Sequence, residues 1–109
     1  NLILGRIYFR LPIRIGDHRY QIGHRGFEGD NLGLVMCYPN PLNPERYVLI
    51  FSGEYWGERL DVNHKYDMLP DFMVFTTSGF APEGDTNEHM CAGFFDVNWM
   101  VDEKTTWVR

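Results

Sequence analysis

Three long apolar runs stand out along the chain, over residues 32–38, 47–51 and 72–77. Runs without polar alternation are typical of strands buried on both faces of a sheet. Residues 7–15 instead alternate between apolar and polar positions, with arginines on the polar side, which predicts a half-buried strand. Shorter apolar stretches predict further strands over residues 2–4, 19–23 and 92–100.

A segment rich in proline and asparagine, residues 38–44, separates the first two apolar runs and holds three of the chain's 6 prolines. Proline fixes φ near about −65° and disfavours a helical conformation in the residue before it. We therefore expect a rigid, kinked connector between two buried strands. The side chains of Asn40 and Asn43 would lie at its turns, where asparagine can cap backbone groups.

The rest of the chain predicts little helix. Residues 55–69 have a weak helical pattern that Pro70 would end, residues 24–31 and 78–90 have the composition of loops, and residues 101–109 form a mostly polar tail. Together, these predicted strands and the one weak helix indicate an α/β or α+β fold. We expect a single small domain with a central mixed sheet of five or six strands, partly parallel, and sparse helical cover.

Composition supports one folded domain and excludes some partners. At 109 residues with 44% hydrophobic side chains, the chain can build one core and is not disordered. Residues 1–25 carry five arginines and one aspartate (+4), and the remainder carries five basic and fourteen acidic residues (−9), which gives the net charge of −5. An acidic chain argues against nucleic-acid binding, and no apolar stretch approaches the roughly 20 residues of a membrane helix.

Candidate chemistry is sparse. Ser52 follows a strand, but Phe51-Ser52-Gly53 lacks the first glycine of a nucleophile elbow, so a turn-capping role is favoured. His89 and Cys91 are two apart without the spacing of a zinc motif. Glu54 and Glu58 fit a solvated helix surface. We predict no catalytic residue, no metal and no cofactor.

Two further features leave alternatives open. Cys37 and Cys91 are expected to be free buried thiols, with a disulfide between them as the alternative. Tyr55 and Trp56 would be core residues or, if exposed, a stacking platform for a sugar or a partner. The possible binding surface is therefore made up of Asn40, Asn43, Ser52, Tyr55 and Trp56.

The segment from Gly33 to Pro44, with its Tyr-Pro-Asn-Pro-Leu-Asn-Pro sequence followed by Arg46-Tyr47-Val48, resembles a region near the C-terminus of bacterial secreted prolyl-oligopeptidase-like α/β-hydrolases of the dipeptidyl aminopeptidase or acylaminoacyl-peptidase type. Leu69–Val74 and Ala92–Trp99 resemble later segments of the same proteins, and Asn1–Gly5 with Leu11–Ile13 resembles two ends of a strand–helix–strand unit. Here only five residues separate those ends, too few for a crossover helix.

The resemblance implies a function without supplying a catalytic residue in this chain. It implies a non-catalytic C-terminal accessory domain, residues 1–109 of a longer exported serine hydrolase or peptidase, that packs on the catalytic domain or shapes substrate access. The location would be periplasmic or extracellular. The isolated chain would expose an apolar edge and could self-associate.

Two other functions remain open. One is an extracellular binding module that uses exposed aromatic side chains. The other is a small independent enzyme, which would need a cleft joining Ser52 or a carboxylate pair to a histidine such as His64.

Overall fold

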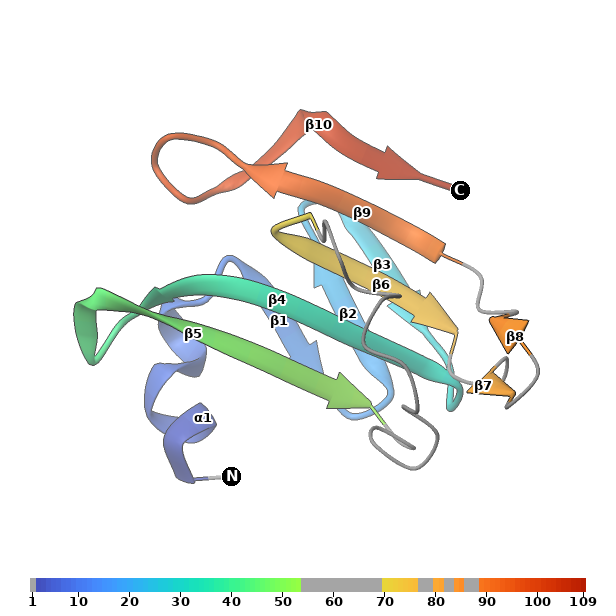
Figure 1. The fold of residues 1–109 in the computed structure, drawn as a ribbon, viewed down its shortest axis with the longest axis horizontal. Coiled ribbons are helices and arrows are strands. Elements are labelled where there is room, and N and C mark those ends of the chain that lie inside the picture. Colours follow the sequence, from blue (N-terminus) through green and yellow to red (C-terminus); the bar gives the residue numbers. More distant parts are fainter. Residues whose placement is uncertain (1, 54–69, 77–79, 82–83, 86–88) are drawn as a thin grey trace.

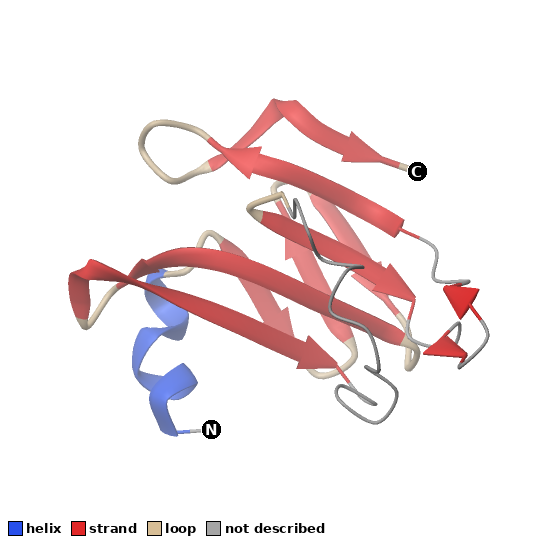
Figure 2. Cartoon of the chain, viewed as in Figure 1, coloured by secondary structure: helices blue, strands red, loops and turns tan. Residues whose placement is uncertain are grey.

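The computed structural model describes residues 2–53, 70–76, 80–81, 84–85 and 89–109, and the helix predicted over residues 55–69 lies outside them. The described chain is mostly strand, with one short α-helix (Figures 1 and 2). Its elements are α1 (Leu2–Ile7), the 3-10 helix η1 (Tyr8–Arg10), β1 (Ile13–Gly16), β2 (Arg19–Ile22), β3 (Arg25–Glu28), β4 (Leu32–Asn40), β5 (Asn43–Gly53), β6 (Phe72–Thr76), β7 (Phe80–Ala81), β8 (Gly84–Asp85), β9 (His89–Phe95) and β10 (Val101–Val108).

The strands form a five-stranded sheet in the order β10-β9-β6-β4-β5, a three-stranded sheet β1-β2-β3, and the small pair β7-β8. The predicted fold class is confirmed: a small, sheet-rich domain with a central sheet and sparse helical cover. The parallel component of that sheet was wrong, because every pairing among the described strands is antiparallel. Parallel neighbours need a long crossover connection, and tight turns join β1 to β2 and β4 to β5 instead.

The hydrophobic core lies between the two larger sheets, and the three-stranded sheet is seen behind the five-stranded one in Figure 1. Ile13 and Ile22 from the smaller sheet pack in one cluster with Leu34, Phe72 and Val74 from the larger one. The two apolar runs of β4 and β6 supply most of the large, fully buried side chains, as their sequence predicts.

The N-terminal region corrects two predicted strands. Residues 2–4 belong to α1, and the alternating stretch 7–15 is divided among α1, η1 and a strand that begins only at Ile13. Ile7 and Leu11 are buried, but Phe9 between them is exposed, as a spacing of four on a helical turn allows. Pro12 separates this helical segment from β1. The apolar residues before Pro12 therefore follow the spacing of a helix, and the alternation that predicted a strand there does not reflect the structure.

Three segments that were predicted to be loops or a polar tail contain strands. β3 lies within residues 24–31, β7, β8 and the start of β9 lie within 78–90, and β10 fills nearly all of the tail. β3, β8 and β10 were not predicted because they are mostly polar, and an antiparallel strand with a solvated face needs few apolar residues.

The proline-rich segment is a hairpin turn rather than a connector between two buried strands. Asn40 pairs with Asn43, so Pro41 and Leu42 form a two-residue loop. The Asn40 side-chain oxygen accepts a hydrogen bond from the Leu42 backbone N–H at 2.9 Å, which is the turn-capping role expected of asparagine. The proline at position 44 is tolerated because β5 is an edge strand.

The apolar run of β5 was predicted to be buried, and most of it is not. It pairs with β4 alone among the described strands, and of residues 47–51 only Ile50 is buried. Tyr47, Leu49 and Phe51 are 66%, 60% and 54% exposed. An apolar run therefore marks the outermost strand of the sheet, where it forms an unusually hydrophobic surface.

Candidate functional site

The predicted binding residues do not form one site. Asn40 and Asn43 face each other at the tip of the β4–β5 hairpin. Ser52 lies at the other end of β5, about 30 Å away at the usual rise of a strand. Tyr55 and Trp56 lie outside the described residues. The asparagines therefore act in a turn, and Ser52 has to be considered separately.

Ser52 is hydrogen-bonded to a buried tyrosine. The Tyr20 hydroxyl donates to Ser52 Oγ at 3.1 Å, across the space between the two sheets. Burial raises the pKa of Tyr20, and the hydrogen bond to Ser52 partly offsets that shift. A nucleophilic serine needs a general base that accepts its proton, and a phenol with a raised pKa is not a base at neutral pH. This contact ties β2 to β5 rather than activating a nucleophile.

A small polar pocket of about 190 Å³ opens beside Ser52 and includes His18. The His18 ring lies between Asp17 and Asp30, at 3.4 Å from Nε2 and 3.5 Å from Nδ1 to the nearer carboxylate oxygens. Both carboxylates are more than nine-tenths exposed, so water screens these pairs. This pocket brings Ser52 and two carboxylates to one histidine, as an independent enzyme would need, but the ring is paired with the carboxylates and does not contact Ser52. His64, the histidine named for that hypothesis, lies outside the described residues.

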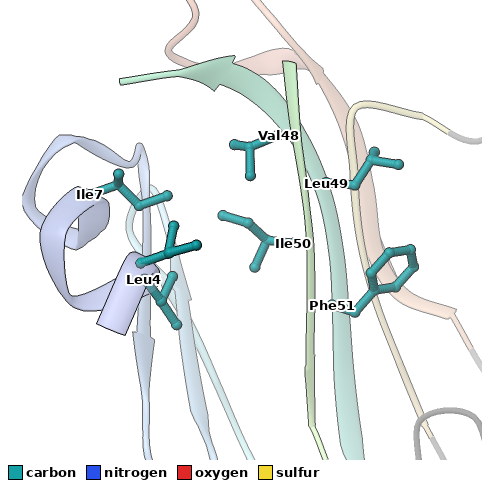
Figure 3. A pocket seen from close by; sticks show the side chains of 7 residues that line it. Leu4, Ile7, Val48, Leu49, Ile50 and Phe51 are labelled. Atoms are coloured by element: carbon teal, nitrogen blue, oxygen red, sulfur yellow. The ribbon is translucent and has the colours of Figure 1, made fainter. Parts of the chain in front are cut away.

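An apolar groove lies between α1 and β5 and has a volume of about 250 Å³ (Figure 3). Leu4 and Ile7 of α1 point toward β5, and Val48 and Ile50 point back toward the helix. Ile3, Leu49 and Phe51 complete the lining. All seven side chains are aliphatic or aromatic, so the groove can bury apolar groups and can supply no acid, base or nucleophile.

The helical wall of this groove was not predicted from the sequence, because residues 2–4 were assigned to a strand. A signal was present: Leu4, Ile7 and Leu11 follow the three- and four-residue spacing of a helical face. The strand wall was recognised as apolar but was expected to be buried.

The described residues contain no group of three or more histidine, cysteine, aspartate or glutamate side chains that could hold a metal ion. Within the same residues, no helix has the length and apolar character needed to cross a membrane.

Both cysteines are free, as favoured over a disulfide. The sheet register explains why they do not meet. Cys91 pairs with Val74, which pairs in turn with Leu34, so Cys91 is aligned with a position three residues from Cys37. Cys91 is buried, whereas Cys37 is only partly so.

The two thiols should differ in reactivity. Burial raises the pKa of Cys91 from 9.0 to about 11, with a smaller opposing effect of Arg25. Burial and the Asp71 carboxylate also raise the pKa of Cys37, but its thiol is partly accessible. At pH 8 we expect iodoacetamide to modify Cys37 at least tenfold faster than Cys91, because alkylation needs an accessible thiolate. Mass spectrometry of timed samples measures both rates. In denaturant they should converge, and equal rates in the folded protein would contradict the burial of Cys91.

No protein-family model, curated protein or solved structure matches this chain.

Proposed function

We propose that this chain is a non-catalytic accessory domain of a longer exported serine hydrolase or peptidase, and that it packs on the catalytic domain or shapes access to it. The observation that carries the proposal is the hydrophobic surface along β5 and α1. Besides the three exposed side chains of β5, Leu2 of α1 is 89% exposed and Ile3 is 60% exposed. A soluble domain seldom exposes contiguous apolar side chains unless another surface covers them.

The chemistry of the described sites agrees with an accessory role. The groove has no polar side chain, and the Ser52 hydroxyl accepts a hydrogen bond from Tyr20. The reaction would therefore take place in another part of the same polypeptide. The periplasmic or extracellular location remains part of this proposal and follows from the resemblance of the hairpin segment to exported hydrolases.

A second candidate function is an extracellular binding module. Phe94 on β9 and Trp107 on β10 are each more than half exposed. Trp107 pairs with Ala92, two residues before Phe94 on the same face of the sheet, so the two rings lie at neighbouring diagonal positions. Such a pair suits stacking against a sugar ring or a partner side chain.

Hydrogen exchange separates these functions when the chain is studied alone and within its complete natural polypeptide. In the accessory-domain proposal, that polypeptide contains a hydrolase domain, and the amides of β5 and α1 exchange at least tenfold more slowly there than in the isolated chain. Replacing Ser52 with alanine should leave the peptidase activity of the complete polypeptide unchanged. A polypeptide without a hydrolase domain, or unchanged exchange along β5, would contradict the proposal. A binding module would instead show protection near Phe94 and Trp107 when a ligand is added.

A further inference from the structure

A pocket with both charged and apolar walls lies between the β2–β3 hairpin of the smaller sheet and β10 of the larger one. Its volume is about 260 Å³. It is therefore smaller than the pockets of roughly 300–1,000 Å³ that hold drug-sized ligands, and it suits a small molecule. The side chains that line it are Ile22, Arg25, Val101, Glu103, Thr106 and Val108.

A large irregularity in the pairing of β10 forms one wall of this pocket. Val101 pairs with Phe95. The next pair is Thr106 with Gly93, so five steps along β10 face two steps along β9. Three residues of β10 therefore bulge out of the ladder. Bulges often re-aim side chains beside functional sites, and this one carries Glu103.

The pocket has one charge of each sign, on different walls. Glu103 belongs to β10, and its Oε1 atom lies 3.9 Å from the position that a Cβ atom on Gly23 would take, so the carboxylate stands beside the β2–β3 turn. Arg25 begins β3 on the other wall. Within the described part of the chain, neither charged side chain has a hydrogen bond or an ion pair, and both are exposed. Both charges are therefore available to a ligand.

The Arg25 guanidinium lies near the Val108 end of the pocket. Burial raises the pKa of the Cys91 thiol to about 11, and the positive charge of Arg25 acts in the opposite direction. This effect requires the guanidinium to be near Cys91, which pairs with Val108 across β9 and β10. A carboxylate bound to Arg25 would therefore have an apolar wall beside it.

The remaining wall residues supply apolar contacts and one hydrogen-bond acceptor. Ile22 is buried, and Val101 and Val108 are half-buried and pack against the hydrophobic core. The Thr106 hydroxyl donates to the Asp102 carbonyl at 2.6 Å, so its oxygen can only accept a further hydrogen bond. An ammonium group supplies such a donor, whereas a carboxylate does not.

The two charges of the pocket select the charge pattern of the ligand. An anion attracted by Arg25 is repelled by Glu103, and a cation attracted by Glu103 is repelled by Arg25. A zwitterion pairs with both side chains and leaves neither of its own charges beside a like charge. Because both side chains are exposed, water screens each pair, and the dissociation constant should lie in the millimolar range.

We propose that this pocket binds a small zwitterion, an amino acid or a dipeptide with an aliphatic side chain, with the ligand carboxylate on Arg25 and the ligand ammonium on Glu103. The aliphatic side chain would lie against Ile22, Val101 and Val108. This inference goes beyond the accessory role proposed above and does not depend on a hydrolase domain, because the described residues of this chain form the whole pocket.

Four related ligands test the need for both charges. L-Valine carries both, isovalerate is the same molecule without the ammonium, and isobutylamine is the same molecule without the carboxylate. L-Alanyl-L-valine has its two charges further apart. In amide chemical-shift titrations, L-valine or the dipeptide should shift residues 22–25 and 101–108. The better of the two should bind at least about fivefold more tightly than either singly charged ligand, the upper range for the loss of one exposed ion pair.

Variants that remove one charge assign the two ends of the ligand. In Glu103→Gln, isovalerate should bind at least as tightly as L-valine, and in Arg25→Gln, isobutylamine should do so. Glu45→Gln on β5 and Arg14→Gln on β1 are the matched controls, because they remove the same charges from exposed positions outside the pocket. Both controls should keep the preference of the natural sequence. Circular dichroism establishes that each variant retains its sheets.

Three results would overturn the inference. Equal binding of isovalerate and the better zwitterion by the natural sequence would identify a simple anion site at Arg25. Equal effects of the pocket variants and their matched controls would place the binding elsewhere. If neither zwitterion shifts residues 22–25 and 101–108 at tens of millimolar, Arg25 and Glu103 are solvated surface charges only.

Discussion

Replacing Phe72 with alanine should destabilise the domain by about 3–5 kcal/mol, the range observed when a buried phenylalanine is truncated. Phe72 is fully buried at the start of β6, and its ring packs against Phe95 with the ring centroids 5.1 Å apart. The side chain belongs to the cluster that joins the two larger sheets. Its removal would leave a cavity where strands on both sides restrict collapse. Because small domains have only about 5–15 kcal/mol of stability, this loss is a large fraction of the total.

Urea unfolding followed by far-UV circular dichroism measures this effect. Phe94→Ala is the matched control, since Phe94 adjoins Phe95 on β9 but is 54% exposed on the other face of the sheet. The control should cost about 1 kcal/mol or less. Equal losses in the two variants would contradict the position of Phe72 at the centre of the core.

The central strands could be predicted because their sequences permit few alternatives. β4 and β6 are continuous apolar runs whose side chains are buried in the structure. Period and length are sufficient where both faces of a strand are covered. The three polar strands β3, β8 and β10 could not be recognised in this way. β3 is held by its register with β2 and by an exposed ion pair between Arg19 and Glu28, which are partners across the two strands.

The apolar run of β5 shows why sequence alone did not locate the candidate site. Residues 47–51 have the composition of a central strand, and composition does not say how many neighbours a strand has. The sheet order places β5 at the edge, so Leu49 and Phe51 become surface residues. The groove then depends on α1, which brings Leu4 and Ile7 beside β5 from a segment that the alternating pattern had suggested was a strand.

The proline-rich segment was recognised as rigid and as a site of turns, but the length of the turn was not predicted. Proline restricts its own φ and the preceding residue, and these local restrictions are compatible with both an open connector and a tight hairpin. The pairing of β4 with β5 decides between them. Asn40 then caps the two-residue loop, so its side chain stabilises the hairpin rather than binding a ligand.

Replacing Gly93 with alanine should also destabilise the domain strongly, by about 3 kcal/mol, the upper part of the usual range for overpacking. Gly93 pairs with Phe72 on one side and with Thr106 on the other. A Cβ atom there would lie 2.6 Å from Cζ of Phe72, 2.9 Å from the Thr105 carbonyl oxygen and 2.9 Å from Thr106 Oγ1. The carbonyl belongs to the backbone of β10, and the Thr106 hydroxyl donates to the Asp102 carbonyl, so neither can move away freely. Gly16→Ala is the control, because its Cβ would be 3.7 Å or more from its neighbours.

A double-mutant cycle identifies the source of this cost. Phe72→Leu removes the ring edge that would meet the new methyl group, so Gly93→Ala should be at least about 1 kcal/mol less destabilising in the Phe72→Leu background than in the natural sequence. The remainder of the cost would come from the Thr105 carbonyl, which the leucine does not relieve. Additive effects of the two substitutions would show that the Phe72 ring can shift within the core. In that case, the close approach of β10 to β9 would be the reason that this position requires glycine.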